Sequence, residues 1–203
     1  MVFCGVSVLF FFLFPGEGYG IVWMILFTFS MSLSVHFFPG SFQPFHNGHL
    51  IVLRGMAKVC ERIVVGIGSA QASGTAEHPF SAAERREMIQ RSLQALNLIP
   101  SHDISFVDLP DIKGNDEAWV KQCRELVQAE IAAIWTGKDE VKACFETAGL
   151  PVKTIKPVPG ISTADVRRRV AAGEDWKELV PADVADYLVE IGGIERLRKL
   201  MLV

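Results

Sequence analysis

Two histidines stand three residues apart around a glycine in the stretch SFQPFHNGH, residues 41–49. His46 and His49 could bind a metal ion, transfer protons, hold an anion or simply form a turn. An acid–base pair usually includes a carboxylate that orients the imidazole, and residues 40–60 contain no Asp or Glu. A zinc site needs further good ligands, and the neighbouring polar side chains are poor ones: Ser41, Gln43 and Asn47.

Anion binding has the better physical support, while an ordinary turn stays open. A helix N-terminus leaves unpaired N–H groups and a partial positive charge pointing outward, which favours phosphate. Gly48 has no Cβ and so would let a phosphate approach the backbone. The two imidazoles could add N–H donors that stabilise phosphate charge during a transfer reaction.

The flanking segments predict a strand, a turn, a helix and a second strand. Residues 33–38 favour a strand that Pro39 and Gly40 stop. Apolar spacing indicates a helix from Gly48 to about Cys60, and the β-branched run 62–68 is typical of a strand buried on both faces. This is a βαβ unit whose first loop lies at the carboxyl edge of the sheet.

The alternation continues along the chain. Ser81 with Glu84, and Ser162 with Asp165, are typical of helix N-terminal caps. Further strands are expected at 104–108, 131–137 and 152–156, and helices at 81–96, 116–128, 139–148, 162–172, 181–190 and 193–201. The pattern predicts an α/β fold, a Rossmann-like doubly wound parallel sheet with a helical C-terminus. Such a sheet binds ligands beyond its carboxyl edge, where we expect the loops 39–49, 69–80, 109–116, 137–139 and 157–162.

Bulk properties narrow the functional class. The net charge of −3 argues against general nucleic-acid binding, so a nucleotide would be held by a local site. The four cysteines are far apart and include no CxxC pair, which argues against a disulfide framework or a zinc knuckle. Reduced thiols and a cytoplasmic location are therefore expected.

The first thirty residues differ from the rest of the chain. Two apolar runs flank the segment PGEGYG, and neither reaches the roughly 20 residues that span a bilayer. No Lys or Arg precedes Arg54, so neither the basic segment of a signal peptide nor an orienting charge is present. A membrane hairpin or anchor and an unrecognised export signal remain alternatives. We favour an extension, 1–30, upstream of one domain, 31–203.

Four segments resemble a known family at similar spacing. GSFQPFHNGH resembles the HxGH signature of the nucleotidyltransferase superfamily, and residues 64–89, 110–120 and 161–181 resemble archaeal-type nicotinamide-nucleotide (NMN) adenylyltransferases. The resemblance implies a nucleotidyltransferase-type fold and an enzyme that joins ATP and NMN to give NAD⁺ and pyrophosphate. The NMN phosphate would attack the α-phosphate of ATP in line, with Mg²⁺ accompanying ATP and no covalent enzyme intermediate.

The resemblance also assigns site residues. The catalytic residues would be His46, His49 and Arg167. The residues that bind ATP would be Gly40, Ser41, Phe42, His46, Gly48, His49, Gly137, Lys138, Ser162, Thr163 and Arg167. The residues that bind NMN would be Gly68, Ser69, Ala70, Gln71 and Trp119, with no metal held by the protein itself. Trp119 would stack on the nicotinamide ring, although an amphipathic helix could equally bury it in the core.

Three departures keep other functions open. Ser41 stands where the archaeal family commonly has arginine, GIST (160–163) resembles cytidylyltransferases, and TGKDEV (136–141) replaces an asparagine-proline loop. The alternative acceptors are phosphopantetheine and glycerol phosphate, and nicotinate mononucleotide is a further one. A non-catalytic nucleotide-binding module is the alternative from another class. Resembling enzymes are often oligomers, so a homo-oligomer is an open expectation.

Overall fold

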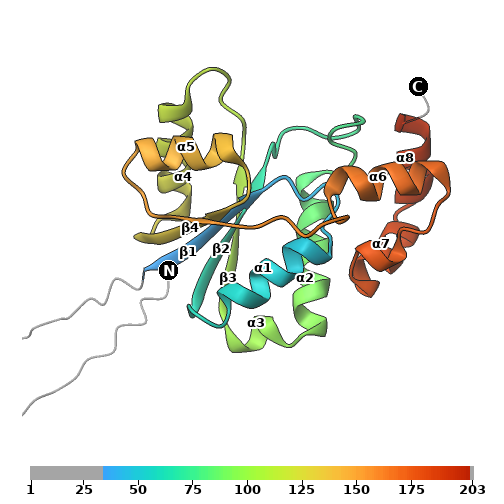
Figure 1. Cartoon of the computed structure of the whole chain (residues 1–203), viewed down its shortest axis with the longest axis horizontal. Helices are drawn as coiled ribbons and strands as arrows, with labels where there is room; N and C mark the ends of the chain where they lie inside the picture. Colours follow the sequence, from blue (N-terminus) through green and yellow to red (C-terminus); the bar gives the residue numbers. More distant parts are fainter. Residues whose placement is uncertain (1–33, 202–203) are drawn as a thin grey trace, which may run out of the picture. The chain divides into compact units, whose positions relative to one another are not determined.

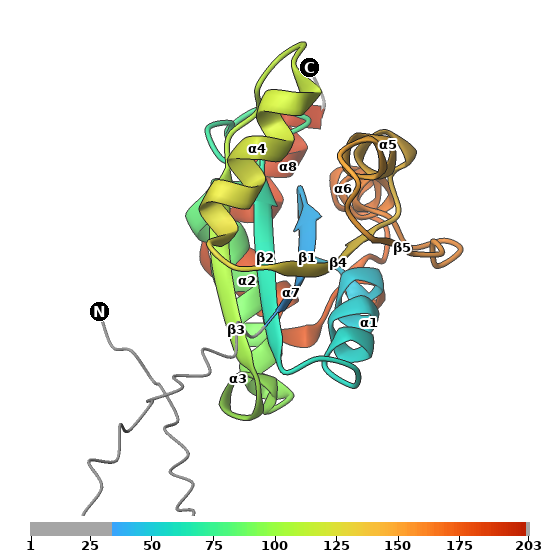
Figure 2. The ribbon, with the colours of Figure 1, turned by 90° about the vertical axis from the view of Figure 1, so that its left-hand side faces the viewer.

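The computed structural model describes residues 34–201, so the expectations for residues 1–30 lie outside the described part of the chain. Five parallel strands form one sheet in the order β3-β2-β1-β4-β5. The strands are β1 (Val35–Gly40), β2 (Arg62–Gly68), β3 (Asp103–Leu109), β4 (Ile131–Thr136) and β5 (Val152–Thr154). The chain builds outward from β1 to β3 and then returns to the other side of β1 (Figure 2). The doubly wound parallel sheet is therefore confirmed, and its topological switch point lies between β1 and β4.

Helices cover both faces of the sheet (Figure 1). They are α1 (Asn47–Met56), α2 (Ala82–Ala95), α3 (Leu98–Ser101), α4 (Asp116–Val127), α5 (Asp139–Thr147), α6 (Thr163–Ala172), α7 (Ala182–Glu190) and α8 (Gly193–Met201), with a 3₁₀ turn at Lys177–Leu179. Helix α3 and the 3₁₀ turn were not predicted from the sequence, because elements of three or four residues are too short to show a periodic pattern of apolar residues.

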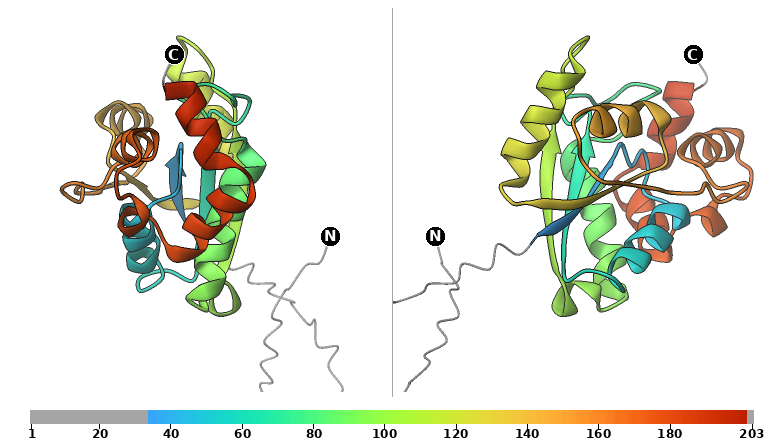
Figure 3. Two further views of the ribbon diagram at one scale, coloured as in Figure 1. Left: turned by 90° about the vertical axis from the view of Figure 1, so that its right-hand side faces the viewer. Right: turned by 60° about the vertical axis from the view of Figure 1, so that its left-hand side comes forward.

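Strand alternation divides the core into two clusters. Phe37 and Val64 face α4 and α5, whereas Phe38 and Val65 face the other helices. This period of two follows from the pleat, because successive side chains point to opposite faces. On the larger side, α7 and α8 lie beside α2 (Figure 3).

Several boundaries differ from the prediction, among them the end of β5, which lies at Thr154 and not at residue 156. Strand β1 continues through Pro39 and Gly40. The Val35 N–H donates to the Glu130 carbonyl, on the side of β4, and an N–H at residue 39 would point to that same side. Pairing with β4 ends at Phe37, so the strand loses no hydrogen bond because Pro39 lacks an N–H. Helix α1 ends at Met56, and the residues up to Cys60 form a tight turn instead.

The helix caps are confirmed. The Ser81 Oγ accepts from the Glu84 N–H at 3.2 Å, and the Glu84 carboxylate accepts from the Ser81 N–H at 2.8 Å. The Ser162 Oγ accepts from the Asp165 N–H at 3.1 Å, which fixes the start of α6. Within residues 34–201, no helix is both long and apolar enough to cross a membrane.

Candidate active site

His46 and His49 cap helix α1 reciprocally. The His49 N–H donates to Nδ1 of His46 at 3.4 Å, and the His46 N–H donates to Nδ1 of His49 at 3.3 Å. Because each Nδ1 accepts a hydrogen bond, the proton of each neutral ring sits on Nε2. The rings stack with their centroids 3.6 Å apart, so both imidazoles are fixed as a pair.

Burial keeps both rings neutral. The pKa of His46 falls from 6.5 to about 4, chiefly because burial disfavours its charged form. The pKa of His49 lies well below its ordinary value because of burial, with smaller contributions from the charges of His46 and Lys138. The rings of Phe42 and Phe45 lie 4.9 and 5.5 Å from the His49 ring. At neutral pH the pair therefore offers two N–H donors and no positive charge.

A pocket of about 280 Å³ opens beside the histidines, where β1 and β4 end and α1 and α6 begin. It coincides with the switch point of the sheet, where such folds bind ligands. Nine of the residues expected to bind ATP line this pocket: Gly40, Ser41, His46, Gly48, His49, Gly137, Lys138, Ser162 and Thr163. Other lining residues were not predicted as site residues: basic Lys156 and apolar Ile155, Val158 and Ile161, although the last two lie in the expected edge loop 157–162.

Two glycines of the pocket lie where a side chain would be crowded. A Cβ at Gly137 would lie 3.2 Å from the Ile155 carbonyl oxygen. A Cβ at Gly40 would lie 2.7 Å from Cζ of Phe42, which is fully buried beneath the loop. Phe42 is thus outside the pocket lining and supports it from behind.

Arg167 also lies outside the lining but is tied to the histidine loop. Its Nη1 donates to the Gln43 carbonyl oxygen at 3.0 Å. Its Nε is buried without a hydrogen-bond partner among the described residues, and burial lowers its pKa. The Arg167 side chain therefore joins α6 to the loop that carries His46.

The expected acceptor loop, Gly68–Gln71, lies next to the histidine loop. A Cβ at Gly68 would be only 3.3 Å from the Gly40 carbonyl oxygen, so the ends of β1 and β2 approach closely. The Asp111 carboxylate accepts from the Ser69 Oγ at 3.1 Å and from the Gln71 Nε2 at 3.0 Å. Ala70 donates its N–H to Leu109, which fixes the same turn. Three strand ends are thereby joined at one edge.

Trp119 is not brought into this pocket. It lies on α4, partly buried, with its ring 5.3 Å from that of Phe145 in the cluster beneath α4 and α5. A larger open groove of about 1060 Å³ runs between these two helices, but none of the expected site residues lines it. Stacking of Trp119 on nicotinamide stays a prediction.

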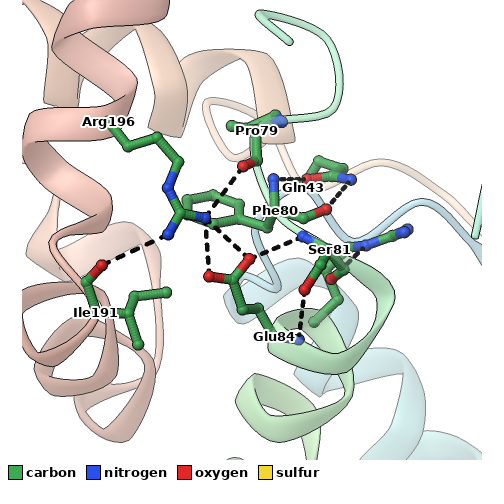
Figure 4. Close-up of polar contacts among 8 residues, drawn as sticks. Gln43, Pro79, Phe80, Ser81, Glu84, Ile191 and Arg196 are labelled. Carbon is green, nitrogen blue, oxygen red and sulfur yellow. Dashed lines mark hydrogen bonds and ion pairs between the residues drawn. The ribbon is translucent and has the colours of Figure 1, made fainter. Parts of the chain in front are cut away.

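Two buried polar residues, Gln43 and Arg85, hold the site together and were not predicted from the sequence. Gln43 is 1% exposed, and its side-chain amide pairs with both the N–H and the carbonyl of Phe80 at 2.9 Å (Figure 4). Arg85 is fully buried and donates to backbone carbonyls of several loops. Both occur within motifs that carried the resemblance, yet a motif does not reveal which partner a side chain meets.

Comparison with known proteins agrees with this geometry. The cytidylyltransferase-like family matches residues 37–169, and the chain therefore belongs to that family. It is 37% identical over 166 residues to a nicotinamide-nucleotide adenylyltransferase of Pyrococcus furiosus, covering 80% of this chain and 87% of that one. An enzyme of the same name from Methanocorpusculum labreanum is also 37% identical, with 80% and 95% covered. The resemblance to archaeal NMN adenylyltransferases is confirmed.

Solved structures support the fold. A bifunctional NMN adenylyltransferase/ADP ribose pyrophosphatase from Francisella tularensis, complexed with AMP and an Mn ion, matches with a TM-score of 0.70 at 19% identity. The match covers 83% of this chain but only 52% of that one. A nicotinic acid mononucleotide adenylyltransferase from Plasmodium falciparum, complexed with APC, matches with a TM-score of 0.58 at 15% identity, covering 80% of this chain and 97% of that one. At these identities the likeness concerns the fold alone.

Proposed function

We propose that this protein is a nucleotidyltransferase that transfers the adenylyl group of ATP to NMN, giving NAD⁺ and pyrophosphate. The observation that carries the proposal is the neutral pair His46 and His49, which line a pocket at the switch point of the sheet and keep an N–H donor on Nε2. The archaeal relatives named nicotinamide-nucleotide adenylyltransferases, at 37% identity over most of the chain, support the choice of reaction.

In this proposal the triphosphate of ATP lies between two helix N-termini. Helix α1 begins at Asn47 and helix α6 at Thr163, and the residues before both line the pocket. Their unpaired N–H groups favour negative charge. Lys138 and Lys156 add two cations to the same lining, while Arg167 approaches from α6.

The chemical step needs no covalent participation of the protein. A phosphate oxygen of NMN forms a bond to the α-phosphorus of ATP while the bond from that phosphorus to the bridging oxygen of pyrophosphate breaks. The Nε2–H groups of His46 and His49 stabilise the charge on the phosphate oxygens as it redistributes. Because both rings are neutral and lack an orienting carboxylate partner among the described residues, we assign them hydrogen-bond donation and not proton transfer.

A divalent ion would enter this site with ATP. The described residues contain no group of three or more His, Cys, Asp or Glu side chains that could hold a metal. The pocket offers N–H donors, hydroxyls and ammonium groups, which suit phosphate oxygens better than a cation. Mg²⁺ is commonly held by substrate phosphates and water, and it would supply charge stabilisation to the departing pyrophosphate. We propose Mg²⁺ in that role.

The acceptor would occupy the edge formed by Gly68, Ser69, Ala70 and Gln71, with Trp119 as the proposed stacking partner of nicotinamide. The acceptor's phosphate would then approach the ATP pocket where β1 and β2 meet. We further propose a cytoplasmic enzyme that acts on small molecules without nucleic acid, whose catalytic domain is 31–203, with a homo-oligomer as an open expectation.

A second acceptor class is favoured by one observation. Ser41 lines the pocket at the position where the archaeal family commonly has arginine, so this site has one phosphate-binding cation fewer. A phosphorylated acceptor such as phosphopantetheine or glycerol phosphate is the alternative.

A substrate panel tests the proposal. The purified full chain would receive ATP or CTP with NMN, nicotinate mononucleotide, phosphopantetheine or glycerol phosphate, and pyrophosphate release would be measured. We expect the highest kcat/KM with ATP and NMN, accompanied by NAD⁺. Pyrophosphate release with another acceptor but not with NMN would show that NMN is not the substrate. Nucleotide binding without pyrophosphate release from any combination of nucleotide and acceptor would indicate the non-catalytic module.

A further inference from the structure

Arg85 is a buried cation that bonds almost entirely to backbone. It lies in the first turn of α2 and is fully buried. Burial of a guanidinium is costly unless its donors are satisfied. Among the described residues, no carboxylate lies within salt-bridge distance of Arg85. Its position is therefore explained by what its N–H groups hold.

Four backbone carbonyls accept these hydrogen bonds. Nη1 donates to Ser41 at 2.8 Å and to Gly68 at 2.6 Å, Nη2 donates to Ser69 at 3.2 Å, and Nε donates to Ser81 at 3.1 Å. A guanidinium is planar and presents its donors at fixed angles. One rigid group thus sets the relative positions of three separate segments of chain.

Two of those segments are the two halves of the proposed site. Ser41 lines the nucleotide pocket, and Ser69 belongs to the loop expected to hold the acceptor. Ser69 has a φ of 48°, in the left-handed region that a residue with a side chain rarely adopts without support. The bond from Arg85 to the Ser69 carbonyl, together with the Ser69 bond to Asp111, supplies that support.

Arg85 keeps its charge at neutral pH. Burial lowers its pKa to about 10, and the nearby carboxylates of Asp108, Asp111 and Glu84 limit that shift. All its N–H donors are therefore present under assay conditions. The neighbouring Arg86 is different, because it is partly exposed and forms an ordinary surface ion pair with Asp108 at 2.7 Å.

We propose that Arg85 is a positioning residue that clamps the nucleotide loop to the acceptor loop and so sets the distance between the two reacting phosphates. This inference rests on the proposed function. In-line transfer requires the reacting atoms to be about 3–3.5 Å apart, and a displacement of about 1 Å can cost about 100-fold in rate. When Arg85 is changed, the bonds to Asp111 still hold the acceptor loop and the reciprocal cap of His46 and His49 still holds the nucleotide loop, so we expect each loop to keep the contacts to its own substrate. The loss should consequently fall on kcat and spare both KM values.

The test compares R85K with two matched variants in the full chain. Lysine keeps the charge but cannot bond to four carbonyls in a plane. L93A removes a fully buried side chain from the same helix and lowers stability without touching either loop. R86K changes the adjacent arginine. For each variant, Tm, kcat and the KM for ATP and for NMN are measured well below Tm.

We expect R85K to lose about 100-fold in kcat, with both KM values within about threefold of wild type. L93A should show a comparable or larger fall in Tm with kcat within about twofold, and R86K should match wild type. R85Q serves as a second variant where R85K is too unstable to assay.

Three outcomes would overturn the inference: wild-type kcat in R85K, an equal loss of kcat in L93A, or failure of both Arg85 variants to fold. An inactive wild type would instead reject the proposed function. Because wild-type activity is measured first, the two failures are distinguishable.

Discussion

Replacing Gly48 by alanine should impair catalysis while leaving stability nearly unchanged. Gly48 is the second residue of α1, and a Cβ there would lie 3.0 Å from both Nδ1 and Cε1 of His46. Ordinary contacts of a Cβ begin near 3.4 Å, so the His46 ring must move by a few tenths of an ångström. The bond from the His49 N–H to the His46 Nδ1 is already long at 3.4 Å and would be lost.

The stability effects nearly cancel. Loss of that hydrogen bond costs about 1 kcal/mol, and alanine gains up to about 1 kcal/mol over glycine in a helix. The effect on the reaction does not cancel, because the displaced ring carries one of the two Nε2–H donors. Removing one donor of this kind costs about 100- to 1000-fold in kcat. For a donor that is displaced but still present, we expect kcat/KM to fall about 10- to 100-fold, or about 1.4–2.7 kcal/mol.

Gly55 provides the matched control. It lies in the same helix, and a Cβ there would meet no atom within 4 Å. G55A should raise the free energy of unfolding by about 0.5–1 kcal/mol and keep kcat/KM within about twofold. NAD⁺ formation can be followed with alcohol dehydrogenase as coupling enzyme, and stability by urea unfolding. A G48A enzyme with wild-type kcat/KM, or an equal loss in G55A, would refute the role assigned to the paired histidines.

Three further variants test other parts of the site. H49A should lower kcat about 100- to 1000-fold, since it removes a phosphate donor, and should also lower Tm because the His49 ring packs against Phe42, Phe45 and His46. NAD⁺ formation is therefore measured well below the Tm of the variant, and near-normal turnover would contradict the assignment. The His46 pKa of about 4 is depressed, so the unfolded chain takes up the proton first as pH falls and stability is lost below about pH 6.5. Urea unfolding should therefore show that the free energy of unfolding of wild type falls by about 2 kcal/mol more than that of H46Q between about pH 7.5 and pH 5. If the two free energies of unfolding changed in parallel with pH, burial would not be the cause of the low pKa of His46. W119A should raise the KM for NMN while sparing that for ATP, and unchanged KM values would leave Trp119 a core residue beside Phe145.

Local patterns in the sequence determined the elements and the reaction class. The βαβ unit, the Ser81–Glu84 cap and the run 62–68 are encoded by residues at most a few positions apart, so hydrophobic period and capping chemistry predict them directly. The segment 41–49 likewise carries its own chemistry, because the histidines that cap α1 are three residues apart. Nine of the residues expected to bind ATP do line one pocket, since parallel strands end at one edge.

Only the tertiary structure decided the protonation state of the two histidines and the relative positions of the loops around them. The low pKa of His46 and His49 arises from burial among rings that the sequence cannot place. Arg167 meets Gln43 across 124 positions, and Arg85 meets Ser41 across 44. Such contacts form only after the sheet has brought distant loops together. The histidine motif alone left metal binding, catalysis and a simple turn open, whereas the folded chain makes it a pair of neutral donors on a loop that Arg85 and Arg167 hold in place.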